Sequence, residues 1–584
     1  MALKEILMDK KELYARGLLT LIVLLMIVLR LVYFYQVRHY PGFAYYLPPD
    51  DQAYYHQTAQ RIAGGFIMGE EGAIARGPGY VYFLGMIYRF SAHDTITALI
   101  IQWCLGVLTG VTIYFLARRL FGLGVALTAA AFYAFYLPAV CYEGALLMAA
   151  LLTALLTTAL YGLIRADQDR TSWPLILSGV LYGWAVLCRP NNLILLVLAL
   201  VFLVWRHNGG RALFRLAVSA GVPYGFLLLR NYFAGGGLFS ITTQGRQVLM
   251  NSHFHQATGV GWHWQDNWDS LLFEYGDGFW RFLGFLAGDI RRHWRDWLGL
   301  QFSKLYAFFF NYEYSQFVDF YSQQEVLSLL RLPSVSLGIL SPLTLMGLVF
   351  LYLDRRQPYR LPLALYFLAG VASIVGFYVL SRFRLPLVPL FCVLGAYGLW
   401  RLPSSINRIN LFGKAALAAG LAVTFYGLNA DSIRKGYADL LMPTAIYNRA
   451  VHYSARGQYK QAAADFQRVY NRMGPDTDPS VYYLVAMNLA NCYRRTARSE
   501  QAAFVWLDLT RKIPEQWQPY YFLGQHYAES GQYGQALMFL EQAVLRRPGD
   551  ENLKSLVEKV RRQAGLAGAL PSLPEKQKGR DLLT

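Results

Sequence analysis

Long apolar runs separated by short basic links constrain the fold of this chain more than any other feature. Of its 584 residues, 55% are hydrophobic and only 15% are charged, well under the quarter that is usual in soluble domains. A helix of about 20 apolar residues can cross a bilayer because all of its backbone hydrogen bonds are internal. The sequence therefore predicts an all-α, polytopic membrane protein with about eleven transmembrane helices. The predicted spans are Gly17–Val37, Thr95–Leu116, Gly124–Val140, Gly144–Ile164, Trp173–Cys188, Asn192–Trp205, Ala212–Leu229, Ser334–Leu353, Leu361–Leu380, Leu385–Trp400 and Leu411–Leu428.

The basic residues between these spans predict their orientation. Lys and Arg collect in every second link, as in Arg118-Arg119 and Arg355-Arg356, and such clusters stay in the cytoplasm. The N-terminus is then cytoplasmic, and a first outer loop (38–94) and a large outer loop (230–332) lie on the other side. The net charge of +18 is spread over these links without a nucleic-acid-binding motif, so we expect a membrane and no nucleic acid as partner.

The C-terminal part has the pattern of a helical repeat. Its signature positions are Tyr520, Gly524, Tyr527, Gly531, Tyr533, Ala536, Leu540, Ala543 and Pro548, with weaker copies upstream. Ala462, Ala502 and Ala536 are spaced by 40 and 34 residues, against the 34 of a tetratricopeptide (TPR) repeat. We predict a membrane domain over 1–430, an extracytoplasmic TPR α-solenoid over 431–566 that binds a protein partner, and a disordered tail over 567–584.

The first outer loop carries the residues best suited to chemistry. Asp50 and Asp51 follow two prolines and open a predicted helix, on which Asp51, Tyr55 and Ala59 share one face. Arg76 follows in an Arg-Gly-Pro turn. A carboxylate can take a proton from a hydroxyl, and a guanidinium can hold a phosphate, so this loop predicts a site at the rim of the bilayer.

This pattern, Asp-x-x-x-Tyr-x-x-x-Ala followed by Arg-Gly-Pro in the first loop, resembles the GT-C superfamily of membrane glycosyltransferases. The resemblance is to the bacterial ArnT/PMT-type (glycosyltransferase 39 or 83-like) proteins, including those with TPR repeats. It implies a polyprenyl-phosphate-linked sugar as donor, a lipid, glycan or protein as acceptor, and an active site outside the cytoplasmic membrane. It also implies that Asp51 is the catalytic base, with Asp50 as its neighbour, in an inverting transfer.

Further candidates come from the ends of later spans. Arg382 and Arg384, in Ser-Arg-Phe-Arg-Leu-Pro, resemble the segment near the lipid-phosphate site of these enzymes, and two guanidinium groups form a good phosphate clamp. Arg189, before Pro190, is a weaker candidate of the same kind. Candidate substrate-binding residues are Tyr55, Glu71, Glu143 and Asn251.

The sequence does not require a cofactor. His253 and His255 form a His-x-His pair that can ligate a metal, but no third ligand has a recognisable spacing, so a divalent metal stays unsupported. A nucleotide-sugar donor would need a Rossmann-like domain, and the sequence contains no GxGxxG or Walker A motif. The donor is therefore expected to arrive within the membrane.

Two alternatives remain open. An O-antigen ligase or polymerase-like membrane enzyme would also have many spans and a large outer loop, with its essential residues in that loop rather than at Asp51. A membrane scaffold or transporter that presents TPR repeats to partners would have no transfer activity.

Overall fold

The computed structural model divides the chain into two compact units, residues 1–445 and 446–584. It describes residues 2–40, 43, 51–72, 74–207, 210–235, 240–261, 271–272, 278–316, 318–407, 410–474 and 477–565. Asp50 and the predicted disordered tail, 567–584, lie outside these ranges. The predicted all-α, polytopic class is confirmed, because every regular element in the described ranges is a helix and many of the helices are apolar.

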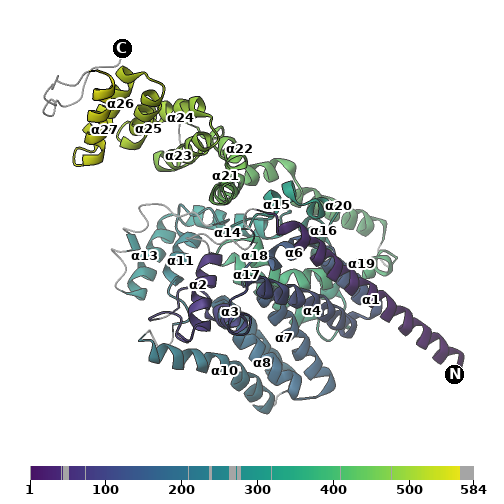
Figure 1. The fold of residues 1–584 in the computed structure, drawn as a ribbon. Helices are drawn as coiled ribbons and strands as arrows, with labels where there is room; N and C mark the ends of the chain where they lie inside the picture. The colour runs from purple at the N-terminus through teal and green to yellow at the C-terminus, as the bar shows by residue number, and fades with distance from the viewer. Residues whose placement is uncertain are drawn as a thin grey trace. The chain divides into compact units, whose positions relative to one another are not determined.

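The larger unit contains six helical segments, among the described residues, that are long and apolar enough to cross a membrane. These are α1 (Ala2–Val37), α4 (Thr95–Phe121), α7 (Ala149–Asp169), α10 (Gly210–Phe233), the run of α18 (Ser381–Arg384), η3 (Leu385–Leu387) and α19 (Val388–Ile406), and α20 (Leu411–Leu428) with the start of the next helix. Shorter apolar helices are α8 (Trp173–Cys188), α9 (Leu193–His207) with η1 (Pro190–Asn192), α16 (Leu337–Leu353) and α17 (Arg360–Val375). Helices α4, α7 and α8 pack side by side (Figure 1).

The predicted span Gly124–Val140 is not one straight helix. It is divided into α5 (Leu123–Ala134) and α6 (Leu137–Glu143), which are bent by 56° at the break. Pro138 lies in the first turn of α6, where its missing N–H costs nothing but where the preceding helix cannot continue. The next span begins at Ala149 rather than at Gly144, and the carbonyl oxygens of Glu143 and Ala145 accept hydrogen bonds from the buried Gln102 amide of α4, at 2.8 and 2.7 Å.

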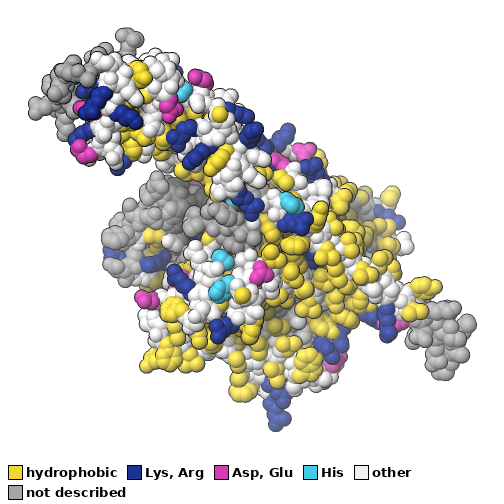
Figure 2. All heavy atoms as spheres, viewed as in Figure 1, with side chains coloured by type: hydrophobic (Ala, Val, Ile, Leu, Met, Phe, Trp, Pro, Cys, Tyr) yellow, Lys and Arg dark blue, Asp and Glu magenta, His cyan; other side chains and the backbone are white. Residues whose placement is uncertain are grey.

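The surface of this unit is apolar over a wide face. Figure 2 shows hydrophobic side chains gathered over α1 and the helices beside it, and Leu21, Leu24 and Leu31 of α1 are all more than half exposed. A soluble protein rarely exposes so large an apolar surface, whereas lipid tails would cover it. The chain is therefore an integral membrane protein.

The loops between the spans contain helices of their own. In the first outer loop these are α2 (Asp51–Ala63) and α3 (Pro78–Phe90). In the large outer loop they are α11 (Gly245–His253), α13 (Phe279–Arg292), α14 (Trp294–Phe309), α15 (Phe320–Val326) and η2 (Ser328–Arg331). Helix α2 packs on α3, and α3 packs on α8, so the first outer loop is fixed against the membrane helices.

The smaller unit is a row of amphipathic helices. After α21 (Asp431–Ala455), which begins in the larger unit, come α22 (Tyr459–Tyr470), α23 (Pro479–Arg495), α24 (Ser499–Lys512), α25 (Trp517–Glu529), α26 (Tyr533–Arg546) and α27 (Glu551–Gln563). From α22 onward each helix packs on the next. Ala462, Ala502 and Ala536 are completely buried, as small residues at close helix crossings are. The assignment of these helices as TPR repeats stays a prediction.

Candidate functional site

Asp51 begins α2, and its carboxylate joins two distant parts of the larger unit. Its Oδ1 lies 2.5 Å from Nη1 of Arg76, and its Oδ2 lies 2.7 Å from Nη1 of Arg382. The three side chains are 14%, 22% and 10% exposed, respectively, so they are largely shielded from solvent but not sealed. The structure thus brings together the predicted base and two of the predicted phosphate-binding residues.

The turn that carries Arg76 is held from two sides. The Tyr54 hydroxyl accepts hydrogen bonds from the backbone N–H groups of Ala75 (3.1 Å) and Arg76 (3.4 Å), and its ring lies 5.0 Å from the Arg76 guanidinium carbon. The Glu70 carboxylate accepts a second hydrogen bond from the Ala75 N–H, at 3.2 Å. Arg76 therefore approaches Asp51 from a backbone that is already fixed.

Arg230, at the end of α10, fixes the preceding part of the same loop. Its guanidinium donates to the carbonyl oxygens of Met68 (3.0 Å from Nε) and Glu70 (2.6 Å from Nη2), and also to that of Gly72. Charge-assisted hydrogen bonds of this kind are stronger than neutral ones, and Arg230 is only 3% exposed. A loop rich in glycine thereby acquires one conformation.

Two glycines let the Arg76 turn approach the end of α8. Gly77 has φ of 29°, and a Cβ there would lie 2.6 Å from the carbonyl oxygen of Cys188. A Cβ at Gly79 would lie 2.8 Å from the backbone nitrogen and from Sγ of the same cysteine. The residue after Cys188 is Arg189, whose guanidinium carbon lies 3.6 Å from the centroid of the Phe383 ring. Arg189 therefore contacts the residue next to Arg382.

Arg384, in contrast to Arg382, is not part of this cluster. It is 1% exposed, and Nη2 bonds to the Glu313 carboxylate (3.3 Å) and to Ser381 Oγ (2.7 Å), while Nη1 donates to the carbonyl oxygen of Phe310 (3.1 Å). Positions two apart on a helix point in nearly opposite directions, and α18 is a helix, so only one of the two arginines can face Asp51. The pair does not form the predicted clamp, and we leave Arg384 out of the site.

Aromatic hydroxyls surround the charged cluster. Tyr55 is 2% exposed and meets the Tyr80 ring edge-on at 4.9 Å, and burial, with the Asp51 carboxylate nearby, raises the pKa of Tyr55 well above its ordinary value. Tyr378 interacts electrostatically with Arg382, Arg189, Asp51 and Arg76, and burial raises its pKa too. Both phenols are therefore neutral and can donate a hydrogen bond.

Sequence reasoning did not select Tyr378, Tyr54 or Gln316. Gln316 Oε1 accepts a hydrogen bond from Nη2 of Arg382 at 2.7 Å, which orients that guanidinium. Tyr378 lies four residues before Arg382, and this closeness to a candidate arginine is the one sequence feature from which its place in the site could be predicted. Gln316 is far from Arg382 in the sequence, and nothing in the sequence marks it.

Three predicted substrate-binding residues lie elsewhere or make other contacts. Glu143 is 1% exposed and forms a bidentate ion pair with Arg30, with both N–O distances 2.8 Å. Asn251 is buried and donates to the carbonyl oxygen of Gly261 at 3.3 Å, within its own loop. Glu71 is exposed, and its neighbour Glu70 is the acid that bonds to the Arg76 turn. We expect Glu143 and Asn251 to support the fold rather than to contact a sugar.

The two histidines predicted as possible metal ligands, His253 and His255, differ in the partners of their ring nitrogens. His253 has both ring nitrogens engaged, Nε2 with the carbonyl oxygen of Gly376 at 2.9 Å and Nδ1 with the Trp297 indole N–H at 3.2 Å. Burial lowers the pKa of His253 to about 4, so it is a neutral structural residue. His255 Nδ1 instead lies 2.9 Å from Oδ1 of Asp289.

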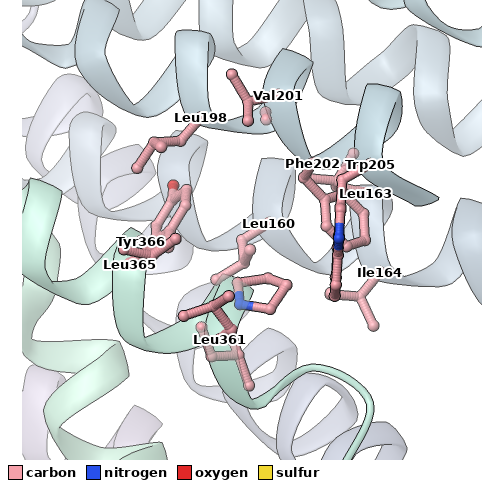
Figure 3. Close-up of a pocket in the computed structure, with 13 residues that line it drawn as sticks. Leu160, Leu163, Ile164, Leu198, Val201, Phe202, Trp205, Leu361, Leu365 and Tyr366 are labelled. Atoms are coloured by element: carbon pink, nitrogen blue, oxygen red, sulfur yellow. The ribbon is translucent and has the colours of Figure 1, made fainter.

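A separate cavity of about 230 Å³ lies between α7, α9 and α17 (Figure 3). Its lining side chains are aliphatic or aromatic, including Leu160, Phe202, Trp205 and Tyr366. Such a lining suits hydrocarbon and offers neither a carboxylate to take a proton nor a cation to bind a phosphate, so we do not place the chemistry there.

Comparison with known proteins locates the family resemblance in one segment of the larger unit. Residues 75–229 match the family of dolichyl-phosphate-mannose-protein mannosyltransferases. The predicted resemblance to the GT-C glycosyltransferases is confirmed over this segment. The segment includes Arg76 and Arg189 but ends before Arg382, and it begins after Asp51. No curated protein matches the sequence.

Two solved structures illustrate the range of similar proteins. ArnT from Cupriavidus metallidurans bound to undecaprenyl phosphate is 15% identical, with a TM-score of 0.39 over 85% of this chain and 81% of that chain. The archaeal oligosaccharyltransferase AglB from Archaeoglobus fulgidus, in complex with an inhibitory peptide and a dolichol-phosphate, is 15% identical, with a TM-score of 0.38 over 81% of this chain. The chain spans 60% of the length of that oligosaccharyltransferase.

Proposed function

We propose that the protein is a membrane glycosyltransferase that moves a sugar from a polyprenyl-phosphate donor to an acceptor hydroxyl of a lipid, glycan or protein. The observation that carries this proposal is the Asp51 carboxylate held between Arg76 and Arg382, at distances of 2.5 and 2.7 Å. A base and two phosphate-binding cations are the groups that this transfer needs. The match of residues 75–229 to a family of lipid-phosphate-dependent mannosyltransferases supports the same reaction.

The ion pairs suggest how the donor prepares the site. In the resting site each oxygen of the Asp51 carboxylate is paired with a guanidinium group, so neither oxygen is free to accept the proton of an acceptor hydroxyl. When the donor phosphate enters, its oxygens compete for Arg76 and Arg382, and the Asp51 carboxylate is released. The base then becomes effective only when a donor is bound, which would limit unproductive reactions.

The transfer itself is a direct displacement with inversion at the anomeric carbon. The acceptor oxygen forms a bond to that carbon while its proton passes to Asp51, and the bond from the same carbon to the phosphate oxygen breaks. The leaving polyprenyl phosphate gains negative charge, which Arg76 and Arg382 stabilise, with Arg189 nearby. The neutral hydroxyls of Tyr55 and Tyr378 can donate hydrogen bonds to the same charge.

The proposed location follows from the basic links. With the N-terminus in the cytoplasm, the Asp51 loop and the smaller unit lie on the extracytoplasmic side, as in a bacterial inner-membrane protein. The lipid-linked donor would reach Asp51 from the bilayer, since α2 packs on α3 and α3 packs against the membrane helices α4 and α8. The smaller unit, which we propose to be a TPR module, would bind a protein partner there.

Transfer by the Asp51→Asn variant tests the proposal. The variant keeps the shape of the side chain but cannot take a proton, and we expect sugar transfer from polyprenyl-phosphate donors to fall by roughly 10²–10⁴-fold. Membranes from a deletion strain that carries each variant would be assayed, and the envelope glycans would be analysed by mass spectrometry. Asp94→Asn, in the N-cap of α4, is a matched control outside the cluster.

The same assay separates the alternatives. Full transfer by the Asp51→Asn variant would contradict the proposed base and would favour a ligase-like enzyme with its essential groups in the large outer loop. No transfer by the unaltered protein with any polyprenyl donor would favour a scaffold or transporter.

A further inference from the structure

Three potential metal ligands meet in the large outer loop. They are His255, just after α11, and Asp289 and His293, at the end of α13, and their ligand atoms all lie within 4.8 Å of one another. Helices α11 and α13 pack together, which brings the two segments into contact (Figure 1). Asp289 and His293 are four residues apart and so lie on one face of the helix.

A simple His–Asp hydrogen bond accounts for only part of this cluster. Asp289 Oδ1 lies 2.9 Å from His255 Nδ1, and Oδ2 accepts the His255 backbone N–H at 3.0 Å. The His293 ring stacks on that of His255 with the centroids 4.4 Å apart, and its Nε2 lies 4.0 Å from the same Oδ1. That distance is too long for a hydrogen bond, so a second imidazole approaches the carboxylate without bonding to it.

We propose that His255, Asp289 and His293 bind a divalent transition-metal ion such as Zn²⁺. Two imidazole nitrogens and one carboxylate oxygen are a common ligand set for zinc, whereas Ca²⁺ and Mg²⁺ prefer oxygen alone. Ligand atoms around a tetrahedral zinc ion are about 3.3 Å apart, given bonds of about 2.0–2.1 Å. The three ligand atoms lie within 4.8 Å of one another, so binding would draw them together to that separation and leave the fourth position for water.

The surroundings fit a bound cation. The Asp289 side chain is 4% exposed, whereas those of His255 and His293 are 30% and 41% exposed, so an ion can enter from solvent and meet a buried carboxylate. Nδ1 of His293 lies 3.9 Å from Oδ2 of Asp296. If Nε2 binds the metal, the Nδ1–H can turn to donate to this carboxylate, as metal-bound histidines commonly do.

The site would fix the loop that supports Arg382. The segment from His253 to Gly261 bonds to the chain just before Arg382: His253 Nε2 to the Gly376 carbonyl oxygen, the Gly259 carbonyl oxygen to the Val379 N–H, and the Gly261 N–H to the Val379 carbonyl oxygen. A metal that ties His255 to α13 would anchor this segment. The role assigned here is structural and does not depend on the proposed transfer reaction.

Zinc binding by the purified full-length protein tests the site. Protein stripped with a chelator would be titrated with Zn²⁺, with bound metal measured by mass spectrometry and unfolding followed by heating. We expect one equivalent to bind and to raise the unfolding temperature, and we expect His293→Ala to weaken binding at least about tenfold. His39→Ala, which removes an exposed histidine at the end of α1, should bind as the unaltered protein does.

A second measurement needs no variant and therefore does not depend on whether a variant folds. Diethylpyrocarbonate modifies accessible histidines, and Zn²⁺ should protect His255 and His293 but not His39. Unchanged modification of His255 and His293 in the presence of Zn²⁺, or equal affinity in the His293→Ala variant, would overturn the proposal.

Discussion

Each carboxylate oxygen of Asp51 forms an ion pair with a different guanidinium, one from Arg76 and one from Arg382. This double pairing determines when the carboxylate can take part in a reaction. Opposite charges at such distances attract by several kcal/mol where water is partly excluded, so the resting carboxylate is well held. A phosphate offers more acceptor oxygens and at least the same charge, and can replace the carboxylate without leaving a cation unpaired. In the proposed reaction, donor binding and release of the base are then one event.

Arg382 and Arg384 are expected to differ sharply although only Phe383 separates them. Arg384→Gln leaves the Glu313 carboxylate buried beside a neutral partner, and we expect a loss of about 3–5 kcal/mol of stability. Arg382→Gln should fold normally but lose transfer activity, because a donor phosphate loses one of its two cations. Thermal unfolding of the purified variants and the transfer assay measure the two effects. Equal stability of Arg384→Gln and the unaltered protein would contradict the structural role of Arg384.

Lys304 is the group from which we expect the stability of the fold to depend on pH. It is completely buried, and Nζ donates to the carbonyl oxygens of Ser252 (3.1 Å) and Phe377 (2.8 Å). Burial lowers the pKa of Lys304 to about 7. Between that pH and the ordinary lysine pKa of about 10.4, the unfolded chain binds a proton that the folded protein does not, so stability rises with pH across this window and is lost as pH falls through it.

We therefore expect Lys304→Met to flatten the rise in unfolding temperature between about pH 7 and pH 10. His253 faces Lys304 and is neutral throughout this range, so it does not add to the change. Lys414→Met, at an exposed position of α20, is the control and should keep the slope of the unaltered protein. A Lys304→Met variant with an unchanged slope would show that another group is responsible.

At the scale of elements, the close approach of the Arg76 turn to the end of α8 sets the geometry of the site. A methyl group at Gly79 would lie 2.8 Å from backbone and sulfur atoms of Cys188, so the turn must move. We expect Gly79→Ala to cost about 1–3 kcal/mol of stability and to reduce transfer. Gly225→Ala in α10, where a Cβ meets open space, should leave both unchanged. Stability and transfer of both variants, measured side by side, check this prediction.

The sequence predicts the elements better than it predicts their contacts. Each predicted span coincides with an apolar helix or helix pair, because hydropathy over a long window depends on composition alone. The break within 124–140 was missed, since Pro138 lies inside a run that is apolar throughout. The helix that starts at Asp51 was found because the preceding prolines and the following glycines mark its ends.

Side-chain partners were harder to predict because they join distant segments. The buried Glu143 pairs with Arg30 of α1, 113 positions away, and nothing in the sequence marks these two residues as partners. Glu313 and Gln316 become partners of Arg384 and Arg382 only because the large outer loop folds back over α18. The direction of each arginine depends on the helical turn over Ser381–Arg384, which is too short to predict.

At the scale of the whole molecule, the orientation in the membrane is the strongest prediction. The link at Gly122, after Arg118 and Arg119, is expected in the cytoplasm, and Gly565, after the last helix, on the other side. An alkaline phosphatase fused after Gly565 should be active, because this enzyme folds only outside the cytoplasm, and one fused after Gly122 should be inactive. The reverse pattern would place Asp51 in the cytoplasm and would exclude the proposed donor path.

The ion pair between Asp51 and Arg382 has a consequence for biogenesis. In the proposed orientation, Asp51 is exported with the earliest part of the nascent chain, whereas Arg382 follows only after most of the membrane unit has been synthesised and inserted. A ribosome-bound intermediate thus contains the acid without one of its two cations. The proposed transferase would stay inert throughout translation and become competent only when its late helices take their places.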